Sequence, residues 1–109
     1  MACYLVQIGW TPETWASMMQ KPYDTLDAVR PPIEKLQGRV IGGWFAFGEY
    51  DLITILELPD NTSAAAISMA VAASGAIRCI KTTALMTVQE GIRAMKLAAE
   101  AGFGVGEPD

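Results

Sequence analysis

The sequence contains no histidine. Histidine is the commonest metal ligand, the usual proximal ligand of haem and the ordinary base for a Ser or Cys nucleophile, so several large enzyme classes drop out. Cysteine is scarce as well: Cys3 and Cys79 lack the paired spacing of zinc or redox motifs, and two cysteines are too few for a disulfide scaffold. We therefore expect two buried free thiols, no metal site and no cofactor.

Positive charge and long apolar runs are also in short supply. Lys and Arg total 8 against 12 Asp and Glu, which gives a formal net charge of −4 that repels phosphate backbones. No apolar run approaches the ~20 residues that a membrane-spanning helix needs, and the N-terminus lacks the basic and apolar regions of a signal peptide. We expect a cytoplasmic protein that binds neither nucleic acid nor membranes.

Apolar side chains are plentiful. Hydrophobic residues make up 51% of the 109 residues, and this length fits a single domain. We expect one domain over residues 1–101. Residues 102–109, which contain three glycines and a proline, should form a flexible tail.

The first part of the chain predicts a strand and a broken helix. Tyr, Leu, Val and Ile cluster over residues 2–8, which is typical of a strand. Thr11 is an N-cap residue type, so a helix should begin there. Pro22 and the pair Pro31-Pro32 each remove backbone donors, so this region should form two or three separate helical pieces.

The middle of the chain predicts a hairpin. A strand over residues 40–47 leads to Gly48-Glu49, and glycine at the first central position favours a two-residue type II′ turn into a strand over residues 50–58. An alanine-rich helix ending at Ala73 and a strand over residues 78–85 follow.

A last helix is signalled clearly. Thr87 and Glu90 are spaced as a capping box. Four residues then form one apolar stripe at helical spacing: Val88, Ile92, Met95 and Ala99. The methionines are interpreted as gap-fillers of the core, because a flexible thioether packs irregular spaces.

These elements give an α+β chain with the βαββαβ order of ferredoxin-like domains and an extra C-terminal helix. In that topology the helices cover one face of an antiparallel sheet, and the other face should alternate with polar residues. Residues 52–56 are instead apolar on both faces, as are residues 3–8. The simplest cover is a second copy, which makes a dimeric α/β barrel, and the alternative is a monomer with an apolar open face.

One segment resembles a known family. Gly48-Glu49-Tyr50-Asp51 follows a Gly-rich aromatic strand and precedes an alanine-rich helix and the segment from Gly75 to Arg78. This arrangement is similar to the GYD family, which has a Gly-x-Tyr-Asp signature. The resemblance extends from Tyr4 to about Glu90. It implies a dimeric α/β-barrel fold and no defined activity.

The motif supplies the catalytic candidates, Tyr50, Asp51 and Arg78. Side chains alternate across a strand, so Tyr50 and Asp51 should point to opposite faces. In the structural interpretation, Asp51 accepts backbone donors or pairs with Arg78. In the functional one, Asp51 is an acid at the barrel mouth and Arg78 holds a substrate carboxylate.

Aromatic residues supply the ligand-binding candidates, because pockets for planar molecules combine aromatic side chains with a few polar groups. Core packing explains the same residues equally well. The aromatic set is Trp10, Trp15, Tyr23, Trp44 and Phe45, and the expected ligand-binding residues are Tyr4, Trp10, Trp44, Thr54 and Thr82.

Three functions stay open. The one we favour is a homodimer that binds a small apolar or aromatic molecule, because convergent catalytic groups are few. The second is a cofactor-free enzyme of monooxygenase, isomerase or cyclase type that uses Tyr50 or Asp51 with Arg78. The third is an assembly module without a ligand, and fold alone does not separate them.

Overall fold

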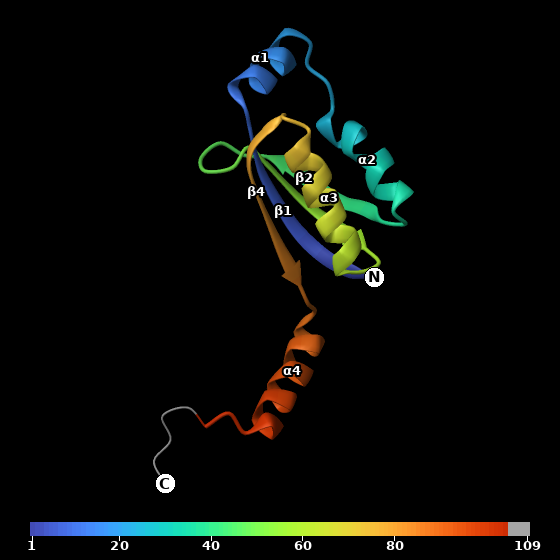
Figure 1. The fold of residues 1–109 in the computed structure, drawn as a ribbon, viewed down its shortest axis with the longest axis vertical. Coiled ribbons are helices and arrows are strands. Elements are labelled where there is room, and N and C mark those ends of the chain that lie inside the picture. Colours follow the sequence, from blue (N-terminus) through green and yellow to red (C-terminus); the bar gives the residue numbers. More distant parts are fainter. Residues whose placement is uncertain (105–109) are drawn as a thin grey trace.

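The computed structural model describes residues 1–104, which form a four-stranded sheet and four helices (Figure 1). The strand order is β2-β3-β1-β4 and all pairs are antiparallel. This confirms the ferredoxin-like βαββαβ order with an extra C-terminal helix. The elements are β1 (Ala2–Trp10), α1 (Pro12–Gln20), α2 (Thr25–Lys35), β2 (Arg39–Phe45), β3 (Leu52–Leu58), α3 (Asn61–Ala73), β4 (Ile77–Leu85) and α4 (Val88–Ala101).

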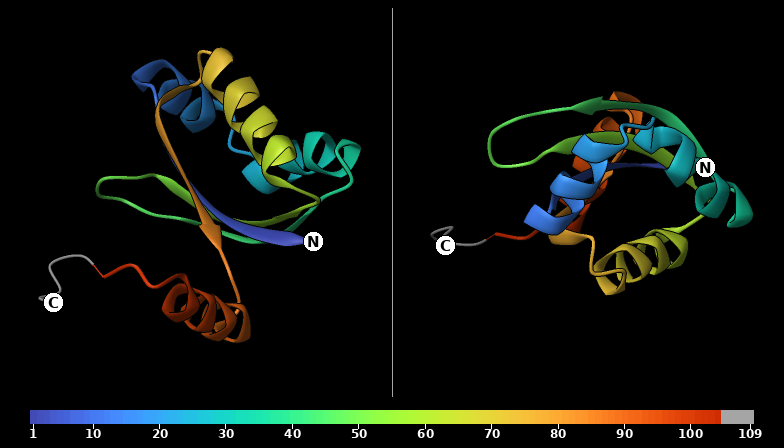
Figure 2. Two further views of the ribbon diagram at one scale, coloured as in Figure 1. Left: turned by 60° about the horizontal axis from the view of Figure 1, so that its bottom comes forward. Right: turned by 90° about the horizontal axis from the view of Figure 1, so that it is seen from above.

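The core lies between the sheet and helices α1, α2 and α3, which share one side of it (Figure 2). Alternation along β1 and β3 sends every second side chain into this layer. The most deeply buried side chains are Ile33 of α2 and Leu56 and Leu58 of β3. A smaller cluster of Trp10, Met18 and Leu52 closes the end of the sheet beneath α1.

The other side of the sheet is not covered by α1, α2 or α3 (Figure 2). We call it the open face and define it from the strand register. It is mainly apolar at its centre, where Leu5 of β1 pairs with Ile55 of β3. Its side chains are Cys3, Leu5, Gln7, Arg39, Trp44, Ile53, Ile55, Glu57, Lys81, Thr83 and Leu85.

Helix α4 does not join the helical layer. It leaves the end of β4 and stands clear of the sheet, on the side of the open face (Figures 1 and 2). Its capping box is present as predicted, with Thr87 and Glu90 each accepting the other's backbone N–H. Gly102 ends it with a left-handed φ of 64°. The predicted tail begins at this glycine, and its residues 105–109 lie outside the described part of the chain.

The predicted two-residue hairpin is wrong. β2 ends at Phe45 and β3 begins at Leu52, so a six-residue loop joins them. The Ala46 N–H donates to the Asp51 carbonyl at 2.8 Å, and the Asp51 N–H turns away to the Ile8 carbonyl of β1. The Ala46–Asp51 bond closes the β2–β3 ladder, so residues 47–50 form a wider loop instead of a two-residue turn flanked by paired Phe47 and Tyr50.

The proline prediction is half right. Pro22 lies between α1 and α2, and the helix is broken there as expected. Pro31 and Pro32 instead lie inside α2, which continues through both. Each removes one helical hydrogen bond, and the burial of Ile33 in the core, together with the Asp24 N-cap, offsets that loss.

Candidate functional site

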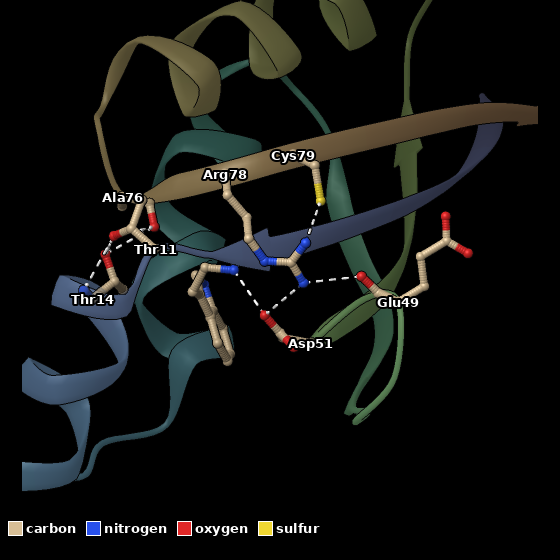
Figure 3. Close-up of polar contacts among 8 residues, drawn as sticks. Thr11, Thr14, Glu49, Asp51, Ala76, Arg78 and Cys79 are labelled. Atoms are coloured by element: carbon tan, nitrogen blue, oxygen red, sulfur yellow. Dashed lines mark hydrogen bonds and ion pairs between the residues drawn. The ribbon is translucent and has the colours of Figure 1, made fainter.

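Asp51, just before β3, and Arg78, near the start of β4, form an ion pair beside the end of β1 (Figure 3). Oδ2 of Asp51 accepts the backbone N–H of Trp10 at 2.9 Å and lies 3.5 Å from Nη2 of Arg78. The same guanidinium nitrogen donates to the Glu49 carbonyl at 3.0 Å. The Asp51 side chain is only 10% exposed and that of Arg78 is 45% exposed, so the carboxylate is the buried partner.

Gly9 makes room for this ion pair. A Cβ at Gly9 would lie 2.6 Å from Cζ of Arg78, so the guanidinium crosses β1 where the chain has no side chain. The β1–β4 register also shifts between Gly9 and Trp10, which is the irregularity that aims Arg78 along this path. Nη1 of Arg78 lies 3.4 Å from Sγ of Cys79, the next residue of β4.

This geometry gives Asp51 a structural role. Its side chain binds Trp10 and Arg78, and its main chain binds Ile8 and Ala46, so one residue ties the β2–β3 loop to β1. Its carboxylate is engaged by groups of its own chain. Tyr50 is half-buried and, within residues 1–104, donates no side-chain hydrogen bond to Asp51 or Arg78. The three catalytic candidates therefore share a region but not a common target.

The five ligand-binding candidates do not share one pocket. Tyr4, Trp10 and Thr54 are buried on the helical side of the sheet. Oη of Tyr4 donates to Asn61 at 2.6 Å and Oγ1 of Thr54 donates to the Val6 carbonyl at 3.2 Å, so both polar groups are already paired.

Thr82 and Tyr4 are the two candidates that the structure brings together. Both line a shallow groove of about 430 Å³ between α3 and β4. Oγ1 of Thr82 lies 2.9 Å from Oγ of Ser68 in that groove. Trp44 lies on the opposite side of the sheet and is 58% exposed.

A different pocket gathers aromatic side chains from α1, the link to α2 and β2. We call it the aromatic pocket, and its volume is about 200 Å³. Trp10 supports it from behind: its ring meets that of Trp15 edge-on at 4.9 Å and that of Phe45 edge-on at 5.6 Å. The lining residues are Trp15, Met18, Met19, Pro22, Tyr23 and Phe45.

A second groove of about 250 Å³ adjoins the aromatic pocket. Tyr23 and Phe45 line both the groove and the aromatic pocket, and Trp44 and Leu26 also line the groove. The aromatic set expected from the sequence therefore converges on this end of the sheet. The core role expected for the methionines is confirmed for Met18, which is buried, and is wrong for Met19, which is 69% exposed and forms a flexible wall of the pocket.

The charged groups that titrate abnormally lie elsewhere. Arg39 hydrogen-bonds to Glu57 across β2 and β3, which lowers the pKa of Glu57 and raises that of Arg39. Within the described residues, no three His, Cys, Asp or Glu side chains gather as a metal-binding group. Cys3 and Cys79 are free thiols, and both are partly exposed rather than buried as expected. No described helix has the length and apolar character needed to cross a membrane.

Comparison with solved structures shows the fold. The chain resembles the crystal structure of FFRP-DM1 with a TM-score of 0.56 and 18% identity over 79% of this chain and 100% of that one. It also resembles an AsnC family transcriptional regulator from Agrobacterium tumefaciens, with a TM-score of 0.52 and 16% identity over 79% of this chain and 50% of that one. In sequence, no curated protein matches the chain significantly.

Family membership rests on a separate sequence match. The model of the GYD domain matches residues 4–95, which cover most of the chain and include Gly48, Tyr50 and Asp51. The resemblance expected from those residues is confirmed. The chain belongs to the GYD domain family.

Proposed function

We propose that the protein is a homodimer that binds a small apolar or aromatic molecule in the aromatic pocket of each subunit. The single observation that carries the binding half is the composition of that pocket: six side chains from three segments, all apolar or aromatic. Tyr23 supplies the one hydroxyl of the lining. Such a lining favours a planar, poorly charged ligand.

The size of the aromatic pocket sets the size of the ligand. An apolar cavity of about 150 Å³ is sufficient for benzene, so about 200 Å³ suits one or two fused rings. The rings of Trp15 and Phe45 each make an edge-to-face contact with the ring of Trp10. These contacts fix two walls of the pocket before a ligand binds. Met19 is exposed and flexible, so it can close over what enters.

Binding is favoured over catalysis because no carboxylate, amine or guanidinium lines the aromatic pocket. Acid–base chemistry needs titratable groups within hydrogen-bond reach of the reacting atoms, and the phenol of Tyr23 is the single such group in this lining. Asp51 and Arg78, the candidates for a cofactor-free enzyme, are bonded to each other and to main-chain groups. The enzyme alternative therefore has no supporting contact at this site.

The dimer half is supported by the open face. Leu5, Ile53 and Ile55 form its centre, and α1, α2 and α3 all lie on the other side of the sheet (Figure 2). Contiguous apolar surface of this kind is typical of an interface. Two of its charged side chains, Arg39 and Glu57, neutralise each other. The third, Lys81, lies on the edge strand β4, where a long side chain can keep its ammonium group in water when two faces stack.

The binding half is tested by titrating isotope-labelled protein with indole and following backbone amide NMR shifts. We expect saturable shifts confined to α1, the α1–α2 link and the end of β2. Phe45→Ala should weaken indole binding about tenfold, because an aromatic contact of roughly 1.4 kcal/mol is lost.

Phe47→Ala is the matched control for this titration. Phe47 is fully exposed in the β2–β3 loop and does not line the aromatic pocket, so its removal should leave indole affinity unchanged. Shifts scattered over the whole surface, or equal loss of affinity in both variants, would contradict binding in the aromatic pocket.

A further inference from the structure

Helix α4 has an apolar stripe that residues 1–104 leave uncovered. Val88, Ile92 and Met95 are 79%, 38% and 72% exposed, and within residues 1–104 no residue of α4 is buried. The stripe has the 3.6-residue spacing of a helix that packs against a partner.

The ends of α4 are nevertheless specified in detail. The reciprocal Thr87–Glu90 capping box fixes its start, and the left-handed Gly102 fixes its end. A 14-residue helix is marginal in water on its own, so most of its stability must come from packing of its apolar side. The helix is therefore well specified at both ends, while within the described residues nothing packs on its apolar side.

The stripe begins close to the open face in the chain, since its first residue, Val88, follows three positions after Leu85, the last open-face residue of β4. A groove of about 530 Å³ lies at this junction, lined by Cys3, Ile55 and Leu85 of the open face, by Met86 of the β4–α4 link and by Glu90 of the first turn of α4. α4 also lies on the same side of the sheet as the open face (Figure 2). Whatever covers the open face is therefore placed beside α4.

We propose that α4 is an arm that packs its apolar stripe against a second copy of this chain seated on the open face. This inference rests on the dimer half of the proposed function. A two-fold axis places the α4 of each subunit against the other subunit, so the open face and the apolar stripe are buried in the same interface. At 1.5 Å per residue the arm is roughly 21 Å long, enough to cross four strands spaced about 4.8 Å apart.

A site-specific photo-crosslinker distinguishes an exchanged arm from a helix that folds back on its own sheet. We would place p-benzoylphenylalanine at Met95, within the stripe, and irradiate the full chain. The expected product is a covalent species of twice the 11.7 kDa chain mass. Crosslinking only within one chain, with no doubled mass, would overturn the proposal.

The matched control position is Leu97. It is 64% exposed and apolar like Met95, but two positions along a helix turn it by about 200° away from the stripe. A crosslinker there should give little doubled mass. Equal crosslinking from both positions would indicate random collision and would also count against the arm.

Sedimentation equilibrium gives the energetic test. The double variant I92E/M95E should weaken dimerisation by about 100-fold, since two apolar side chains lose their burial, whereas L97E should leave it unchanged. A wild-type dimer that is indifferent to I92E/M95E overturns the arm and leaves open-face pairing intact. A wild-type monomer overturns both, and the indole titration then still tests the aromatic pocket by itself.

Discussion

The backbone N–H of Trp10 donates a 2.9 Å hydrogen bond to Oδ2 of Asp51, although the two residues are 41 positions apart. The bond joins the last residue of β1 to the loop that precedes β3. Both partners are buried, with Trp10 5% and Asp51 7% exposed. The aspartate of the family motif is thus the acceptor for a buried main-chain donor, and its neighbour Arg78 offsets its charge.

Asp51→Ala should destabilise the fold by about 1–3 kcal/mol, because it leaves the Trp10 N–H buried without an acceptor. Urea unfolding followed by tryptophan fluorescence measures the change. Asp27→Ala is the control, since Asp27 forms only an exposed i,i+3 pair with Arg30 and should cost less than about 0.5 kcal/mol. Equal effects of the two substitutions would argue against the role of the buried bond.

Gly38→Ala should also destabilise, by about 1–3 kcal/mol, because overpacking forces the backbone to move. A Cβ at Gly38 would lie 2.5 Å from the Glu57 carbonyl oxygen and 2.6 Å from a methyl group of Leu58. Gly91→Ala is the contrasting case, since its new Cβ would meet nothing closer than Sδ of Met86 at 4.0 Å. Thermal unfolding should place Gly38→Ala below wild type and Gly91→Ala at or above it.

Local chemistry was sufficient to predict most of the fold. The βαββαβ order, the break at Pro22 and the Thr87–Glu90 capping box all follow from neighbouring residues, and all are present. The predicted hairpin was too tight because Ala46 and Asp51 form the last backbone bond between the two strands, and Asp51 is also fixed to β1, which is distant in sequence. Periodicity reports only near neighbours, so it cannot reveal such a competing contact.

The candidate site was harder to predict for the same reason. Tyr4 and Thr54 looked available for a ligand, but their hydroxyls are paired with Asn61 and the Val6 carbonyl. The convergence of Trp15, Tyr23 and Phe45 depends on how α1 sits against the end of β2, which no local pattern encodes. The aromatic residue types indicated a binding pocket, but the tertiary fold determines which of them line it.

Acid should weaken the fold through Asp60, the N-cap of α3. Its carboxylate accepts the Ser63 backbone N–H at 2.8 Å, and this bond lowers the pKa of Asp60. A lowered folded-state pKa contributes stability that is present above the unfolded pKa, about 3.9 for Asp, and is lost as the pH falls through the folded value.

Asp60→Asn keeps an N-cap acceptor and removes this titration, so stability should depend less steeply on pH in that acidic range. Urea midpoints measured for both proteins from about pH 5 down to about pH 2.5 give the comparison. Parallel pH curves for wild type and Asp60→Asn would mean that the cap titration contributes nothing to folding.

If the proposed open-face dimer forms, Ile55→Asp should convert it to a monomer while leaving each subunit folded. Ile55 lies at the centre of the open face, opposite Leu5 in the register, and a carboxylate there meets water in a monomer but must be desolvated when two faces stack. Sedimentation equilibrium should give the variant a dimer dissociation constant about 100-fold higher than that of wild type. The far-ultraviolet circular dichroism spectrum should be unchanged. Met69→Asp introduces the same charge on the outer side of α3, where the side chain is 70% exposed, and should remain dimeric. If Ile55→Asp sediments like Met69→Asp, the two copies meet somewhere other than the open face.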